Sequence, residues 1–371
     1  MKESQVGFKT GIIGLPNVGK STIFNALTRT AAAQAENFPF CTIEPNVGEV
    51  AVPDRRLDEL GSIAFSKQII PTKMTFVDIA GLVKGASRGE GLGNQFLGNV
   101  KECEAIAHIL RCFDDNDVTH VEGRVDPLDD VKIIETELIL SDLESVHKQL
   151  NNLERKLKAN DSDARKQATL LEKAEFFLSR EQFVRNIELE ADEQKSFKML
   201  NLLTAKPMLY VCNVNESSAK TGNKYSDLIS NIASEKKSAC VIISAAIEEE
   251  ISQLSDIGEM ELFLSDMGLA ESGLDRLIQA GYELLGLQTF FTVGPKEARA
   301  WTVKANTTAP KAAGVIHSDF EDGFIRAETI SYADFVDFGG ELGAKEAGKL
   351  RSEGKTYLVQ DGDVLKFLFN K

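Results

Sequence analysis

Short apolar runs alternate with helical patterns over much of the chain. Strands are predicted at residues 9–15, 74–79 and 105–113, with stretches of helical periodicity between them. This alternation is typical of a parallel sheet covered by helices. Two later runs, at 208–214 and 239–244, have the same β-rich character and are expected to join the same sheet. The fold class predicted is α/β with a mostly parallel sheet.

Between these two groups of strands the sequence becomes charged and rich in leucine. Apolar residues recur there at alternating spacings of four and three, which is the seam of a coiled coil. After a polar turn at 158–163 the spacing resumes, so an inserted antiparallel helical hairpin is predicted. Plain amphipathic helices on a globular core are the alternative. The seam residues are Ile139, Leu143, Val146, Leu150, Leu153 and Leu157, followed by Ala164, Leu171, Ala174 and Leu178.

After Gly286 the pattern changes again. Short strands are predicted around 290–293, 300–303 and 364–369, divided by glycine, proline and charged loops. This pattern of short strands and polar loops indicates a small, separate α+β module. The expected organisation is a discontinuous α/β domain (1–130 and 206–286), a helical insertion (131–205) and a C-terminal domain (287–371).

Composition narrows the class of protein. A chain of 371 residues with 43% hydrophobic content can build two or three cored domains. Its net charge of −15 disfavours a general DNA or polyanion binder, although a local basic patch stays open. The five cysteines have neither a disulfide nor a zinc spacing. Lys9 interrupts the N-terminal apolar run and no stretch reaches membrane-span length, so a cytoplasmic protein without membrane insertion is expected.

The chemistry begins with the eight residues 14–21, GLPNVGKS, which follow the first predicted strand and precede a helical pattern. They form a phosphate-binding P-loop. Its glycines let backbone N–H groups surround the phosphates, Lys20 reaches the β- and γ-phosphate oxygens, and the Ser21 hydroxyl can ligate Mg²⁺. The helix that opens at Gly19 adds the positive end of its dipole. A nucleoside triphosphate site is therefore predicted.

Such a site also needs a carboxylate for Mg²⁺ and a glycine whose N–H meets the γ-phosphate. Asp78 and Gly81, in the sequence DIAG, supply both. The segment 81–93 contains five glycines and is expected to change conformation with the nucleotide. Thr42 is the expected second hydroxyl ligand of Mg²⁺. The alternative is that Thr42 is a strand residue after a buried loop.

The group that positions the attacking water is not the residue that follows the glycine of DIAG. Many related GTPases place a glutamine after the glycine, but this chain has Leu82, which can neither donate nor accept. Ligand sites in parallel sheets form at the carboxyl ends of strands, and the loop after 105–113 contains His120. Because an imidazole can accept and donate, His120 is the candidate catalytic residue. A solvated loop histidine is the alternative.

Base choice is expected at the end of the run 208–214. Guanine-specific enzymes place Asn-Lys-x-Asp there, whereas residues 213–216 read NVNE. The lysine stem that covers the base and the aspartate that accepts from guanine are both missing, while asparagine can pair with the N6/N7 edge of adenine. ATP is therefore predicted over GTP. The expected base-pocket residues are Asn213, Asn215 and Glu216, completed by backbone amides of the segment Ser244, Ala245 and Ala246.

Taken together, these motifs resemble the YchF group of Obg-related P-loop NTPases, from Phe8 to the C-terminus. The most specific similarities are NFPFCTIEPN at 37–46, GASRGEGLGNQF at 85–96 and NVNE at 213–216. The resemblance implies a Mg²⁺-dependent ATPase with slow intrinsic turnover that acts as a nucleotide-controlled switch. It also implies a coiled-coil insertion and a C-terminal TGS module of β-grasp type from about Leu287.

The resemblance further implies roles for single residues. The family's phosphate contacts match Asn17, Val18, Gly19, Lys20, Ser21 and Thr22. Hydroxyls matching Ser21 and Thr42 bind Mg²⁺ there, and a histidine matching His120 acts in hydrolysis. Ribosome association is implied as well, with the helical and C-terminal domains as the expected contact. Two readings stay open beside the ATPase: a GTPase or dual ATP/GTP-binding regulator, and an ATP-dependent binding module with little turnover.

Overall fold

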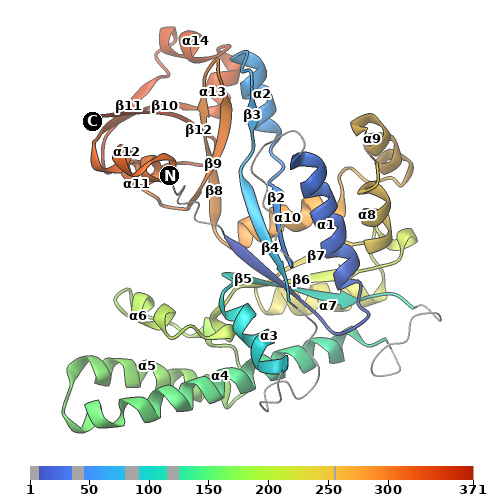
Figure 1. Ribbon diagram of the computed structural model, residues 1–371, viewed down its shortest axis with the longest axis vertical. Helices are drawn as coiled ribbons and strands as arrows, with labels where there is room; N and C mark the ends of the chain where they lie inside the picture. Colours follow the sequence, from blue (N-terminus) through green and yellow to red (C-terminus); the bar gives the residue numbers. More distant parts are fainter. Residues whose placement is uncertain (1–7, 36–45, 80–91, 115–124, 255, 371) are drawn as a thin grey trace.

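The computed structural model describes residues 8–35, 46–79, 92–114, 125–254 and 256–370. Figure 1 shows a central sheet with helices on both faces, a long helical hairpin that projects from it, and a second sheet formed mainly by the C-terminal part of the chain. Within the described ranges, no helix combines the length and apolar character needed to cross a bilayer.

The central sheet contains β1 Lys9–Ile13, β2 Val47–Ala51, β4 Lys73–Asp78, β5 Ala105–Arg111, β6 Met208–Asn213 and β7 Ala239–Ile243. Their order across the sheet is β2-β4-β1-β5-β6-β7, and every pair is parallel except β2 with β4. All residues of β5 and β6 are buried, as strands covered on both faces require. The predicted mostly parallel sheet is confirmed, and β2 is an addition to it.

Helices cover both faces of this sheet: α1 Lys20–Ala35 and α10 Gly273–Leu284 on one face, α4 Pro127–Lys158 and α7 Lys224–Glu235 on the other. Side-chain alternation along the strands separates the faces. Gly281 of α10 lies against Met74, whereas Tyr210 points to the opposite face and donates to Glu135 of α4 at 2.7 Å. The other helices of this part are α3 Leu92–Lys101, α8 Ala245–Ile251 and α9 Ile257–Asp266.

The predicted helical hairpin is confirmed: α4 is followed by α5 Ser162–Leu178. Asp126 caps α4, whose first residue is a proline, and Asp161 accepts from two N–H groups of the first turn of α5. The turn between the helices uses Asn160 at a φ of 60°. The seam positions Ile139, Val146, Leu153, Ala164, Leu171, Ala174 and Leu178 are buried, and Leu143, Leu150 and Leu157 are partly buried against them.

One buried carboxylate ties the hairpin to the chain that returns from it. Asp142 accepts from the N–H groups of Leu203 at 2.8 Å and Thr204 at 2.7 Å, and from the Thr204 hydroxyl at 2.7 Å. Burial raises the pKa of Asp142, and the three donors oppose that shift. The hairpin therefore has a fixed attachment to the segment that leads into β6.

The second sheet contains β8 Leu287–Val293, β9 Ala298–Lys304, β10 Phe324–Ser331, β11 Arg351–Glu353, β12 Asp363–Phe369 and a short β3 Ile69–Ile70. Its order is β11-β10-β12-β8-β9-β3. The accompanying helices are α11 Ala309–Ile316, α12 Ser318–Asp322, α13 Tyr332–Asp337 and α14 Glu341–Glu346. The predicted α+β character of this part is confirmed, with strands at all three expected places.

Strand β3 belongs to the C-terminal sheet although it lies in the N-terminal part of the sequence, which the sequence pattern did not predict. The segment between β2 and β4 leaves the central sheet, forms α2 Arg55–Ile63, and adds β3 to the C-terminal sheet in parallel with β9. Leu57 and Leu60 of α2 are buried in one apolar cluster with Phe291 and Ala298. We call residues 55–70 the docked segment.

Charged groups fix the docked segment at its start. The Arg56 guanidinium lies between two carboxylates, 2.8 Å from Asp54 Oδ2 and 2.6 Å from Asp361 Oδ2. Asp361 also accepts from the Thr289 N–H at 2.8 Å, and Tyr332 donates to Glu59. Side chains from opposite ends of the sequence therefore hold α2 on the C-terminal sheet.

Candidate functional site

The P-loop lies where β1 ends and α1 begins. Residues 14–19 form the turn, and α1 starts at Lys20, so Ser21 and Thr22 are in its first turn. Val18 is buried and the Ser21 side chain is exposed. The six predicted phosphate-contacting residues, Asn17 to Thr22, therefore occupy one loop and helix start, the arrangement that binds phosphate through backbone N–H groups.

Backbone conformation explains the residue types in this loop. Gly19 has a φ of 91°, and a Cβ at this position would clash with the side-chain amide of Asn213. Asn17 also has a positive φ, 63°, which asparagine adopts more readily than most residues. The loop shape therefore depends on glycine at 19 and tolerates asparagine at 17.

The predicted phosphate-binding lysine and the predicted metal-binding aspartate meet in the structure. Lys20 Nζ is 2.5 Å from Asp78 Oδ1, and the two side chains are 11% and 16% exposed. Asp78 ends β4, which pairs with β1 so that Ile12 lies beside it. The carboxyl ends of two neighbouring parallel strands thus bring these groups together, as ligand sites in such sheets require.

The donors at this place suit Mg²⁺. Ser21 offers a hydroxyl oxygen and Asp78 a carboxylate, the hard ligands that this ion prefers. In the part of the chain that the structure describes, no group of three or more His, Cys, Asp or Glu side chains could hold a metal ion.

Asn213 has a different contact from the one predicted. It was expected to pair with the adenine edge, but its Nδ2 donates to the Val18 carbonyl at 2.9 Å and its Oδ1 accepts from the Ala245 N–H at 3.0 Å. The residue is 2% exposed. Asn213 therefore bridges the P-loop and the start of α8, because its amide can donate and accept at once.

The same hydrogen bond occupies the backbone N–H of Ala245, a group that was expected to face the base. Ser244 is buried, and among the described residues its hydroxyl has no hydrogen-bond partner. Asn215 and Glu216 are exposed at the end of β6, where the 3-10 helix η4 Glu216–Ser218 begins. Those two side chains thus remain accessible to a ligand.

Three predicted site residues cannot be placed. Thr42, Gly81 and His120 lie outside the described residues, as does Leu82. The described residues nearest to them in the sequence are Asn46 before β2, Ile79 after β4 and Val125 before α4. The roles predicted for the three residues stay predictions.

Sequence reasoning missed a buried acid close to the base-pocket loop. Glu248 in α8 is 1% exposed and accepts from the N–H groups of Gly273 at 2.7 Å and Leu274 at 3.3 Å, at the start of α10. Burial raises the pKa of Glu248 to about 7, against the two backbone donors. The sequence did contain a signal for this burial. Glu248 lies three residues after Ala245 and three before Ile251, and positions i and i+3 share a helix face, so Glu248 is on the same buried face as these two apolar residues.

Replacing Glu248 with glutamine is expected to change how stability depends on pH. Because the folded-state pKa is about 7 and the ordinary value is 4.5, the folded protein binds more protons than the unfolded chain between these values. Stability from this group is therefore present below pH 4.5 and is lost as pH rises through 7, by about 3 kcal/mol. The measurement is urea unfolding of both proteins from pH 4.5 to pH 8.

The comparison with Glu248→Gln is needed because another group has the opposite effect. His108 is fully buried on β5, which lowers its pKa to about 3, so its contribution to stability grows as pH rises toward 6.5. Both proteins contain His108, so the difference between their unfolding free energies isolates Glu248. A difference that does not change with pH would show that Glu248 has an ordinary pKa.

Known proteins match the chain along its length. Residues 9–173 match the family model described as a 50S ribosome-binding GTPase, and residues 287–370 match the C-terminal model of YchF GTPases, described as a protein of unknown function. The ribosome-binding ATPase YchF of Escherichia coli O157:H7 is 53% identical over 365 residues, which are 98% of this chain and 100% of that one. The Bacillus subtilis (strain 168) protein of the same name is 50% identical over 362 residues, 97% and 98% of the two chains.

Structural comparison gives the same result. The solved structure of the Schizosaccharomyces pombe YchF GTPase matches with a TM-score of 0.88 at 38% identity, over 98% of each chain. The parallel sheet, the P-loop and the contact of Lys20 with Asp78 define the class as a P-loop nucleoside triphosphatase. Identity at this level over nearly the whole length is decisive for the family. The chain belongs to the YchF family.

Proposed function

We propose that this chain is a Mg²⁺-dependent ATPase that hydrolyses ATP slowly to ADP and phosphate, and that it acts as a nucleotide-controlled switch on the ribosome. The observation that carries this proposal is the meeting of Lys20 and Asp78 beside the P-loop. The printed names of the bacterial relatives, ribosome-binding ATPase, support both the nucleotide and the partner.

Each residue of the phosphate site has a proposed task. Lys20 stabilises charge that develops on the transferred phosphoryl group, and the Gly81 N–H donates to the same group. Ser21, Thr42 and Asp78 would hold Mg²⁺, which supplies neutralisation of the phosphate charge when bound. His120 orients the attacking water in place of the glutamine that Leu82 replaces. We expect slow turnover because Leu82 replaces the usual glutamine and the sequence motifs supply no arginine finger.

For the base pocket we propose two kinds of residue, those that position the loops and those that contact the base. Asn213 and Ala245 set the distance between the P-loop and the base loop, since their polar groups bind each other and the Val18 carbonyl. Asn215 and Glu216 are exposed and would contact the base directly. The unpartnered hydroxyl of Ser244 supports a ligand contact too, because a buried polar group without a partner is costly.

We infer that the chain contacts the ribosome through the helical hairpin and the C-terminal domain. We assign the C-terminal domain to the TGS type of β-grasp module. A ribosomal partner implies action in the cytoplasm. The net charge of −15 argues against general DNA binding.

Calorimetric titration of the nucleotide-free protein with Mg·ATP and Mg·GTP tests the proposed substrate. We expect at least tenfold tighter binding of ATP, about 1.4 kcal/mol. Equal or tighter GTP binding would return the chain to the ordinary GTPases. Restoring a lysine at Val214 is not a suitable test, because this side chain is 2% exposed and the substitution would bury a charge.

A further inference from the structure

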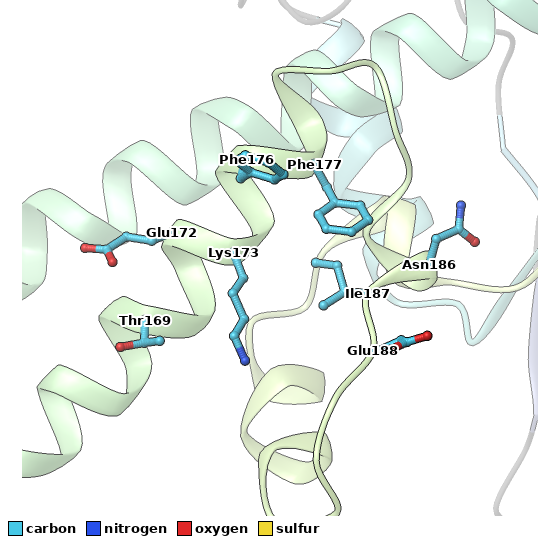
Figure 2. A pocket seen from close by; sticks show the side chains of 8 residues that line it. All are labelled: Thr169, Glu172, Lys173, Phe176, Phe177, Asn186, Ile187 and Glu188. Atoms are coloured by element: carbon cyan, nitrogen blue, oxygen red, sulfur yellow. The ribbon is translucent and has the colours of Figure 1, made fainter.

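A groove of about 630 Å³ lies against α5 of the helical hairpin. Figure 1 shows α5 well away from α1, the helix that begins at the P-loop. The groove lies between α5 and the chain that follows the 3-10 helix η2 Val184–Asn186 (Figure 2). Its size is in the range of pockets that take a ligand or a partner's side chains. The lining residues are Thr169, Glu172, Lys173, Phe176, Phe177, Asn186, Ile187 and Glu188. None of them belongs to the nucleotide site.

The groove has an apolar floor with one exposed aromatic ring. Figure 2 shows Phe177 and Ile187 facing each other, and both pack against the main core. Phe176 beside them is 54% exposed. The Arg180 guanidinium lies 3.5 Å from the centre of that ring and donates to the Phe176 carbonyl at 3.1 Å, so the ring is held in place while still exposed. A fixed, exposed aromatic next to an apolar floor is characteristic of a protein-binding surface.

The charges around the floor indicate the kind of partner. Lys173 is neutralised by Glu193, with Nζ 2.8 Å and 3.0 Å from the two carboxylate oxygens. Glu172 and Glu188 are exposed and form no ion pair with any residue that the structure describes. Beside the single cation of Arg180 on the Phe176 ring, the groove thus presents two unpaired carboxylates, so its net charge attracts Lys and Arg side chains rather than phosphates.

We propose that this groove docks a basic, amphipathic segment of a ribosomal protein. One apolar side chain of that segment packs on Phe176 and Ile187, and its Lys or Arg side chains pair with Glu172 and Glu188. Ribosomal RNA is disfavoured here because its phosphates would meet the two carboxylates. This docking site rests on the proposed function, because the partner is the ribosome. It specifies the surface of this chain that binds and the basic, amphipathic character of the segment that is bound.

Reversing the two charges tests the proposal by the sign of the effect. The double variant Glu172→Lys, Glu188→Lys should bind purified ribosomes at least tenfold more weakly in a sedimentation assay, since the basic segment is now repelled. If the groove contacted RNA, the same change would strengthen binding. The matched control is Glu250→Lys, Glu261→Lys, which makes the same change in net charge on exposed positions of α8 and α9. The control should bind as the unaltered chain does.

A second variant keeps the test independent of charge. Phe176→Ala removes the exposed ring and should weaken ribosome binding several-fold, while the melting temperature and ATP affinity stay unchanged. The groove is not the ribosome-binding surface if the Glu172→Lys, Glu188→Lys variant binds ribosomes as well as or better than the unaltered chain, or if Phe176→Ala binds them equally well. Either result would leave the proposed function intact. Failure of the unaltered chain to bind ribosomes would overturn the proposed function and this inference with it.

Discussion

Replacing Lys20 with alanine is expected to reduce single-turnover ATP hydrolysis by about 10²- to 10³-fold, the usual cost of removing one fixed donor from a transition-state site. Lys20 is 11% exposed and its Nζ lies 2.5 Å from Asp78 Oδ1, so its position is fixed by the same carboxylate that is proposed to hold Mg²⁺. Removing the ammonium takes away one positive charge that stabilises the developing charge on the phosphoryl group. The measurement is phosphate release from one equivalent of bound ATP.

The matched control is Lys355→Ala, which removes an exposed lysine of the C-terminal part. It should hydrolyse ATP at the unaltered rate. His120→Ala in the same assay tests the proposed water-positioning role, and an unchanged rate would assign that role elsewhere. Retention of more than a tenth of the activity by Lys20→Ala would contradict the task given to this residue.

Replacing Asn213 with alanine should damage both stability and nucleotide affinity. The substitution leaves the buried Val18 carbonyl and the Ala245 N–H without their partners, at about 1–3 kcal/mol for each group. We therefore expect the free energy of unfolding to fall by about 2–4 kcal/mol. We also expect ATP to bind at least tenfold more weakly, because the P-loop and the base loop lose the side chain that joins them. Urea unfolding and calorimetry measure the two effects.

Asn215→Ala is the control two positions away. Asn215 is exposed, and its side chain accepts only a 3.3 Å hydrogen bond from Ser217 among the contacts seen in the structure, so stability should not change. A loss of affinity for ATP without a loss of stability would agree with direct base contact by Asn215. Equal stability of Asn213→Ala and the unaltered chain would show that the bridge is dispensable.

Local patterns were sufficient for much of the fold. The strands that carry Asp78 and Asn213, and the coiled-coil seam of α4 and α5, follow from spacings of a few residues that reflect burial on one or both faces. The P-loop and Asp78 were predictable for a similar reason: strand order in a parallel sheet brings their carboxyl ends together.

Contacts between distant segments could not be predicted in this way. Strand β3 has only two residues, and its partner β9 lies more than 200 positions later in the chain. No local period reveals such a pairing. The bridge made by Asn213 was missed because an asparagine near a base pocket can face either the ligand or the protein, and only the position of Val18 and Ala245 decides which.

The docked segment has a consequence for how this protein is made. Leu57 and Leu60 leave the ribosome early, yet Phe291 and Ala298, which bury them, are synthesised more than 200 residues later. During translation α2 therefore presents an uncovered apolar face, and such nascent surfaces are where chaperones bind and aggregation begins. A nascent chain arrested before residue 287 should remain incompletely folded around α2, so the last-made strands complete a structure begun near the first.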